Sequence, residues 1–222
     1  MKFTGGTPRG ILIPFILGVI CLVLCSCSLF ESKIRVPVAK KIDIPVQQEP
    51  QVCNQPYCST NLDFPLSLVS KPMIYVNKAE RRLWLIQDQV LVRDYHVGLG
   101  PSPRGDKYFR GDGRTPEGEY FICSKNGSSQ YYKSLGINYP NPKQAECGLT
   151  SGAITYSDYC QIVRANDAQK MPPSNTALGG LIMIHGGGCH MDWTLGCVAV
   201  ENSAMDELFQ VVKIGTPVYI VP

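Results

Sequence analysis

The sequence predicts a protein that is mostly β with short helices, an α+β fold. Short apolar runs recur along the chain between turn residues such as Gly, Pro and Asn, a pattern typical of strands. A helical spacing of apolar residues occurs at 154–168 and at 203–213. With 222 residues, of which 44% are hydrophobic, the chain is long enough to enclose a sizeable core.

The N-terminus, residues 1–27, looks like a lipoprotein-type signal peptide. Lys2 and Arg9 precede an apolar stretch at 11–24, which is too short to span a bilayer and suits a signal-peptide core. The stretch ends in a sequence that resembles a bacterial lipobox, in which Cys27 becomes the lipidated N-terminus and anchors the chain to a membrane. A plain secretory signal and an uncleaved N-terminal anchor are the alternatives.

The remainder divides near residue 71. Residues 28–71 mix Pro, Val, Lys and Gln without a period and are expected to form an extended linker. Residues 72–222 are expected to hold the folded domain. The formal net charge is +3 at pH 7, and the chain without its signal segment carries two positive charges fewer. Nucleic-acid binding requires a concentrated basic face, so no nucleic-acid partner is expected.

The strands of the domain are expected where its apolar runs occur. An opening hairpin turns at 77–80, and its strands and the later ones are expected at 73–76, 82–86, 90–97, 119–123, 181–184, 198–200 and 217–221. Asn202 stands where a side chain caps the helix 203–213. His96, in the third strand, is expected to be a packing or surface histidine.

Residues 98–118 are rich in Gly, Pro and charge and are expected to form a loop. Its basic residues are Arg104, Lys107, Arg110 and Arg114. Guanidinium groups bind carboxylates through paired hydrogen bonds, so these side chains are candidates for binding substrate carboxylates. A solvated loop held by its turn residues is the alternative interpretation.

The stretch 181–202 carries a candidate catalytic pair. His185 follows an apolar run and stands at the end of an expected strand, and Cys197 precedes the next apolar run. An imidazole within hydrogen-bond reach draws a thiol toward the thiolate, which attacks carbonyls. Gly196 leaves room for a substrate, and the N–H groups here are candidates for an oxyanion site. His190 is a rival base, but it follows a glycine run, whereas a strand positions His185.

The pattern His185-Gly186, a variable loop and Thr194-x-Gly196-Cys197 resembles the signature of the L,D-transpeptidase catalytic domain (YkuD) family. Further segments resemble the opening hairpin of that family and its middle loops, the latter especially in the YafK-like branch: 74–92, 105–120 and 134–141. The resemblance covers roughly residues 72–222. It implies a mixed β-sheet sandwich with the catalytic cysteine in a groove.

The resemblance also implies roles for these residues. Cys197 is the expected nucleophile and His185 the base, with the Gly186 carbonyl orienting the imidazole. The expected oxyanion and substrate-binding residues are Gly196, Thr194 and Arg114. The implied reaction is acyl transfer on peptidoglycan stem peptides, through a thioester on Cys197 that an amine acceptor resolves. No metal or organic cofactor is expected, and the expected location is the periplasmic side of the bacterial cell envelope.

Two residues depart from the commoner family pattern. Leu195 stands where the family has a second histidine, and Ala199 stands where it has an arginine. The missing arginine leaves the family's usual way of holding its substrate in doubt, and a loop arginine is the candidate replacement. Both departures match the YafK-like branch, in which some members resemble hydrolases that release attached lipoprotein from the wall. Transferase and hydrolase therefore both stay open, with a wall-attached lipoprotein as a candidate partner of the hydrolase.

Two other classes of function are weaker hypotheses. A metal module built from Cys189, His190, Cys197 and His185 matches no regular zinc spacing, and ligation would silence the nucleophile. A wall-binding domain without catalysis has no need of the Cys197–His185 pair.

The remaining cysteines are even in number, which in an exported chain predicts disulfides. Spacing favours a Cys53–Cys58 bridge, while the other pairings stay open among Cys123, Cys147, Cys160 and Cys189.

Overall fold

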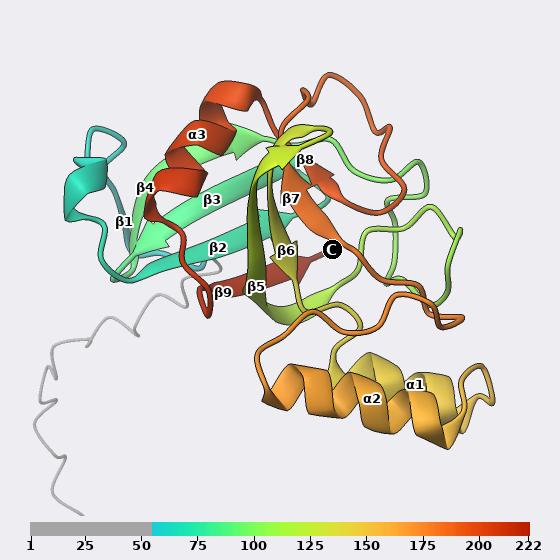
Figure 1. Ribbon diagram of the computed structural model, residues 1–222. Coiled ribbons are helices and arrows are strands. Elements are labelled where there is room, and N and C mark those ends of the chain that lie inside the picture. Colours follow the sequence, from blue (N-terminus) through green and yellow to red (C-terminus); the bar gives the residue numbers. More distant parts are fainter. Residues whose placement is uncertain (1–54) are drawn as a thin grey trace, which may run out of the picture. The chain divides into compact units, whose positions relative to one another are not determined.

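The computed structural model describes residues 55–222, which form a nine-stranded mixed sheet in the order β1-β4-β3-β2-β9-β5-β6-β7-β8 (Figure 1). The predicted signal peptide, Cys27, Cys53 and the first part of the predicted linker lie outside the described residues. The strands are β1 (Ser59–Thr60), β2 (Pro72–Asn77), β3 (Arg82–Gln87), β4 (Val90–His96), β5 (Gly118–Ser129), β6 (Tyr132–Ile137), β7 (Met183–His185), β8 (Val198–Ala199) and β9 (Pro217–Val221). The helices are α1 (Pro142–Thr150), α2 (Tyr156–Asp167) and α3 (Asn202–Val211), with a 3-10 turn η1 (Leu66–Leu68).

The first half of the sheet is an antiparallel meander of β2, β3 and β4, and β9 joins it in parallel with β2. Alternation along β2 sends Ile74 and Val76 into the core. The opposite face of the meander is also covered, because Trp84 stacks on Tyr75 with ring centroids 5.6 Å apart. β3 is therefore buried on both faces, in agreement with its continuous apolar sequence.

The long strand β5 links this meander to the part of the sheet that carries the candidate site. Its first residues, Gly118–Phe121, pair with β9, and its later residues pair with β6. Register shifts beyond Ile122 mark the point where the strand changes partner. β6 then pairs with β7, and β7 runs parallel to β8.

Helix α3 covers the core shared by both parts of the sheet (Figure 1). Met205 and Leu208 of the helix lie in one apolar cluster with residues such as Leu135 and Ile184. The predicted helix 203–213 is thus present, but the predicted Asn202 cap is wrong. Glu201 is the N-cap residue and makes no side-chain cap, while the Asn202 side chain accepts a hydrogen bond from the Gly187 N–H at 2.9 Å.

Helices α1 and α2 form a hairpin inserted between β6 and β7, away from α3 in Figure 1. Each begins with a capping box, Asn141 with Gln144 and Thr155 with Asp158. The hairpin has a small apolar cluster of its own, which includes Ala145 and Ile162. The sequence predicted α2 but not α1.

The end of the segment predicted as a linker makes contacts with the folded domain. β1 pairs in parallel with β4, and Val69 lies in the main core with Phe64 packed against it. The mostly β fold with three helices confirms the predicted fold class. Within residues 55–222, no helix has the length and apolar character needed to cross a membrane.

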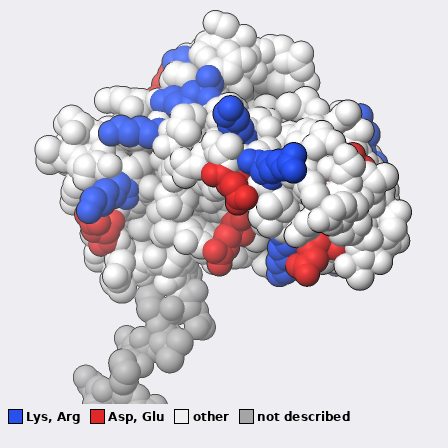
Figure 2. Space-filling view, turned by 60° about the horizontal axis from the view of Figure 1, so that its bottom comes forward, with Lys and Arg blue, Asp and Glu red and all other residues white. Residues whose placement is uncertain are grey.

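On the face shown in Figure 2, basic side chains lie mainly across the upper and middle part and acidic ones mainly below them, with uncharged residues between them.

Candidate active site

Strand pairing brings the two predicted catalytic residues to one place. In the parallel pair of β7 and β8, His185 is opposite Ala199 and Ile184 is opposite Val198. Cys197, one step before β8, therefore lies at the level of Met183, and the Met183 N–H is 3.4 Å from its sulfur. His185 ends β7 and Cys197 precedes β8, so the two residues lie two register positions apart on neighbouring segments, about 7 Å along the strand direction.

His185 is held in one orientation and is almost completely buried, with 3% of its surface exposed. Its Nδ1 lies 2.7 Å from the Gly186 carbonyl oxygen. Because a carbonyl only accepts, Nδ1 carries the proton and Nε2 is left as the basic nitrogen. Burial lowers the pKa of His185 below 6.5, more than the Gly186 hydrogen bond raises it. The imidazole is therefore neutral at pH 7, as a general base must be.

Two aromatic rings enclose this imidazole. Tyr131, in the turn between β5 and β6, stacks on His185 with centroids 4.8 Å apart, and Trp193 meets the imidazole edge-on at 5.5 Å. The Trp193 indole N–H donates to the Gly188 carbonyl at 3.1 Å, which ties the ring to the glycine loop. Asn202 holds the same loop through the Gly187 N–H. Tyr131, Trp193 and Asn202 thus hold the His185 imidazole and its loop, and sequence reasoning missed these contacts for all three.

The Cys197 thiol rests in its protonated form. Its sulfur lies 3.7 Å from the Leu181 carbonyl oxygen, which can only accept, so the S–H points there. Burial raises the pKa of Cys197 above 9.0, and the Met183 N–H and the Lys107 ammonium lower it in part. Among the described residues no hydrogen bond joins Cys197 to His185. The expected drawing of the thiol toward thiolate by an imidazole is therefore not present in this resting arrangement.

A tight turn fixes the peptide that carries the nucleophile. The Thr194 hydroxyl donates to the Cys197 carbonyl at 2.7 Å and accepts from the Gly196 N–H at 3.2 Å. Gly196 has φ of +124°, and a Cβ there would lie 2.6 Å from the Arg114 carbonyl oxygen. The Gly196 N–H is thus occupied by Thr194, whereas the Cys197 N–H has no hydrogen-bond partner within residues 55–222.

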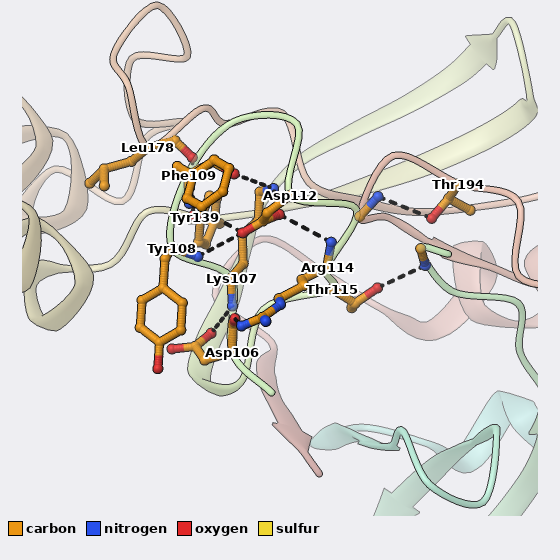
Figure 3. Close-up of polar contacts among 12 residues, drawn as sticks. Asp106, Lys107, Tyr108, Phe109, Asp112, Arg114, Thr115, Tyr139, Leu178 and Thr194 are labelled. Carbon is orange, nitrogen blue, oxygen red and sulfur yellow. Dashed lines mark hydrogen bonds and ion pairs between the residues drawn. The ribbon is translucent and has the colours of Figure 1, made fainter. Parts of the chain in front are cut away.

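The loop 98–118 reaches this turn through the Arg114 carbonyl and the Thr115 hydroxyl, and not through its guanidinium groups. Thr115 accepts from the Gly100 N–H and has its hydroxyl 3.4 Å from the Cys197 carbonyl (Figure 3). The Arg114 guanidinium turns away to the Asp106 carbonyl at 3.2 Å and lies over the Tyr108 ring. The other basic residues differ: Lys107 is buried, Arg110 donates to the Ser174 carbonyl, and Arg104 is exposed.

The two residues that depart from the family pattern, Leu195 and Ala199, lie in opposite environments, one exposed and one buried. Leu195 is 86% exposed, so nothing in the domain packs around it. Ala199 is fully buried opposite His185, and its backbone pairs with Gly98. An arginine at position 199 would have to place its guanidinium inside the sheet.

The rival residues lie outside this arrangement. His190 has an 88% exposed side chain and approaches Glu201 at 3.6 Å, and His96 is exposed at the end of β4. A cavity of about 790 Å³ is lined by Cys189, His190 and Glu201, among others, and by neither His185 nor Cys197. No group of three or more His, Cys, Asp or Glu side chains suited to a metal ion occurs in the part of the chain that the structure describes.

The cysteines of the described residues are free thiols, so the disulfides predicted among them are absent. They are distributed over separate elements: Cys58 beside β1, Cys123 on β5, Cys147 on α1, Cys160 on α2, and Cys189 and Cys197 in the loop between β7 and β8. Cys123 is half-buried, and its partial burial raises its pKa to about 11. The Cys53–Cys58 pairing stays a prediction, because Cys53 is not described.

Comparison with known proteins gives matches along the same segment. The family model of the L,D-transpeptidase catalytic domain (YkuD) matches residues 71–220. YafK of Escherichia coli strain K12, by name a candidate L,D-transpeptidase, is 28% identical over 141 residues, which are 63% of this chain and 42% of that protein. The YafK protein of Escherichia coli O157:H7 matches with the same figures. The chain thus matches less than half of the length of these relatives.

Solved structures are more distant. Pgp2 of Campylobacter jejuni, a helical cell shape determining protein solved as a K307A mutant, is 24% identical with a TM-score of 0.47, over 72% of this chain and 54% of that one. The L,D-transpeptidase of Xylanimonas cellulosilytica is 17% identical with a TM-score of 0.41, over 68% and 61%. The family model spans more than half of the chain and includes His185 and Cys197. The chain therefore belongs to the L,D-transpeptidase catalytic domain (YkuD) family.

Proposed function

We propose that the chain is a cysteine-nucleophile L,D-transpeptidase that acts on peptidoglycan stem peptides during cell wall remodelling. The observation that supports this most is that strand pairing places a half-buried thiol, just before β8, near a buried neutral imidazole at the end of β7. The imidazole has its Nδ1–H fixed on the Gly186 carbonyl and its Nε2 free to take a proton. The family acts on peptidoglycan stem peptides.

The proposed reaction has two halves. In the first, His185 Nε2 takes the Cys197 proton and the sulfur attacks the carbonyl between the L-centre of diaminopimelate and D-alanine. A thioester forms, the C–N bond breaks, and the leaving D-alanine amine receives the proton from His185. In the second half an acceptor amine gives a proton to His185 and attacks the thioester, which releases the Cys197 thiol and forms the new amide.

The oxyanion of each tetrahedral intermediate is proposed to lie at the Cys197 N–H. Thr194 holds this turn by donating to the Cys197 carbonyl. The Gly196 N–H can donate to the oxyanion only after its hydrogen bond to the Thr194 hydroxyl breaks. Arg114 is proposed to bind a substrate carboxylate only after its guanidinium leaves the Asp106 carbonyl. We further propose that Cys27 carries a lipid anchor and that the enzyme works on the periplasmic side of the cell envelope.

A hydrolase of the same substrates is the second candidate. The buried Ala199, in place of the family's arginine, supports it, because the usual contact with the substrate is absent at this position. Water in place of the acceptor amine would then resolve the thioester, releasing a wall cross-link or an attached lipoprotein.

The test is mass spectrometry of the full-length chain incubated with muropeptides that contain tetrapeptide stems. Cys197→Ala and His185→Ala are run beside wild type, with Cys147→Ser as the matched control because Cys147 is an exposed thiol on α1. New cross-linked dimers or exchange of the terminal D-amino acid, lost only in the two site variants, establish the transpeptidase. Loss of existing links without dimers establishes the hydrolase. Equal products from wild type and Cys197→Ala contradict both.

A further inference from the structure

The loop 98–118 contains a buried ion pair whose role the proposed reaction does not use. Lys107 and Asp112 have side chains only 3% and 4% exposed, and their charged atoms are 2.7 Å apart. Figure 3 shows the Lys107 and Asp112 side chains together in the loop, with Thr115 and Thr194 farther to the right. A buried ion pair adds little stability relative to apolar packing, so its benefit is better sought in what it holds in place.

Asp112 is the organising acceptor of this loop. Its Oδ1 accepts from Lys107 Nζ at 2.7 Å and from the Arg114 N–H at 3.1 Å. Its Oδ2 accepts from the Tyr108 and Phe109 N–H groups at 2.8 and 3.2 Å. Lys107 Nζ also donates to the Phe109 carbonyl at 3.1 Å. The pair thus fixes the backbone from residue 107 to residue 114.

The fixed backbone bears directly on the nucleophile. The Arg114 carbonyl lies so close to Gly196 that a Cβ at that glycine would approach it to 2.6 Å. The next residue, Thr115, has its hydroxyl 3.4 Å from the Cys197 carbonyl. A displacement of Asp112 is therefore passed through Arg114 and Thr115 to the peptide of Cys197.

The charge of the ion pair also affects Cys197, besides the position of the loop. The ionisable groups around the pair are Asp106 and Arg114 on the same loop and the Tyr139 phenol beyond β6. Within the pair itself, the Lys107 ammonium lowers the pKa of Cys197.

We propose that Lys107, held by Asp112, is a positioning residue for Cys197: the buried ion pair fixes the loop backbone whose Arg114 carbonyl and Thr115 hydroxyl pack against the Gly196–Cys197 turn. This inference rests on the proposed role of Cys197. Because Lys107 is 3% exposed and both its contacts are internal, it acts through Cys197 and not through the substrate.

The experiment measures the pH profile of Cys197 alkylation by iodoacetamide in the full-length chain, with peptide mass spectrometry to isolate Cys197 from the other cysteines. The main variant is the double substitution Lys107→Met with Asp112→Asn, which leaves no unpaired buried charge and so protects folding. Lys107→Arg keeps the cation. Lys78→Met is the matched control, since Lys78 is also a buried lysine that holds this loop, through the Gly105 and Thr115 carbonyls and Glu117.

In the double variant we expect the alkylation midpoint to rise, because the ammonium that lowers the pKa of Cys197 is gone, and the alkylation rate at a fixed pH below the midpoint to fall. Lys107→Arg should keep the wild-type midpoint, and so should Lys78→Met even though it loosens the loop. In turnover the double variant should lower kcat and leave KM almost unchanged. An unchanged midpoint in the folded double variant overturns the proposal, as does an equal rise in Lys78→Met.

Alkylation needs no turnover, so this result is independent of the proposed function. If Cys197→Ala kept full activity while the Lys107 shift appeared, the assigned reaction would be wrong and the electrostatic coupling would stand.

Discussion

Gly196 should be the least replaceable glycine of the site. Its φ of +124° lies outside the left-handed helical region, and a Cβ would lie 2.6 Å from the Arg114 carbonyl oxygen, which is backbone and cannot rotate away. A strained backbone conformation costs about 1–3 kcal/mol, and forcing an extra methyl into a packed site costs about 1–3 kcal/mol more. Gly196→Ala should therefore lower the free energy of unfolding by about 2–6 kcal/mol.

Gly152→Ala is the matched control. Gly152 also has a positive φ, +73°, but a Cβ there meets nothing within 4 Å. Gly152→Ala should therefore lower the free energy of unfolding only by the cost of the left-handed conformation, about 1–2 kcal/mol. Both substitutions lower the entropy of the unfolded chain equally, so that effect cancels in the comparison.

The assay is urea unfolding followed by tryptophan fluorescence, with turnover measured on the same preparations. Gly196→Ala should also lower turnover about tenfold or more, because the substitution displaces the peptide of the nucleophile. Gly152→Ala should keep turnover. If Gly196→Ala were no less stable than Gly152→Ala and equally active, the close packing of Arg114 on Gly196 would not exist in solution.

Three further predictions test separate parts of the structure. Alkylation of Cys197 in the free enzyme should rise with pH and reach its midpoint above 9.0, since burial raises the pKa of this thiol; a midpoint near 6 would indicate a resting thiolate–imidazolium pair instead. Leu83→Ala should cost about 2–5 kcal/mol in urea unfolding because Leu83 is fully buried, whereas Leu68→Ala, at a 63% exposed position, should stay within about 0.5 kcal/mol of wild type. Asn202→Ala removes the acceptor of the Gly187 N–H, so it should lower the free energy of unfolding by about 1 kcal/mol and reduce turnover. The pH midpoint of Cys197 alkylation should not change. Unchanged turnover would mean that the glycine loop holds His185 without Asn202.

The sequence predicted best the elements whose own residues carry the signal. The strands β2, β3 and β9 are apolar or alternating, and each was expected within one or two residues of its observed bounds. β6 was missed because its sequence, YKSLGI, contains Lys, Ser and Gly, and it becomes a buried strand only between β5 and β7. The helix α1 was missed because its apolar stripe is weak, although Asn141, Pro142 and Gln144 form a readable helix start.

The same limit applies to the site. His185 and Cys197 stand out by residue type and by the strands around them. Tyr131 and Lys107 come from distant parts of the chain, and only the tertiary structure brings them to the site. Asn202 was predicted to cap the helix, a local role, but its side chain accepts a hydrogen bond from the distant Gly187 N–H instead. Local patterns identify the reacting groups, whereas the groups that orient them depend on packing.

The most direct test of the central claim is to trap the acyl-enzyme. The full-length chain is mixed with a tetrapeptide-stem muropeptide, quenched in acid and digested, and the adduct is located by peptide mass spectrometry. The account predicts a thioester on Cys197 that carries the stem without its terminal D-alanine, in wild type and not in Cys197→Ala. Product formation with no adduct on Cys197, or with the adduct on another residue, would contradict it.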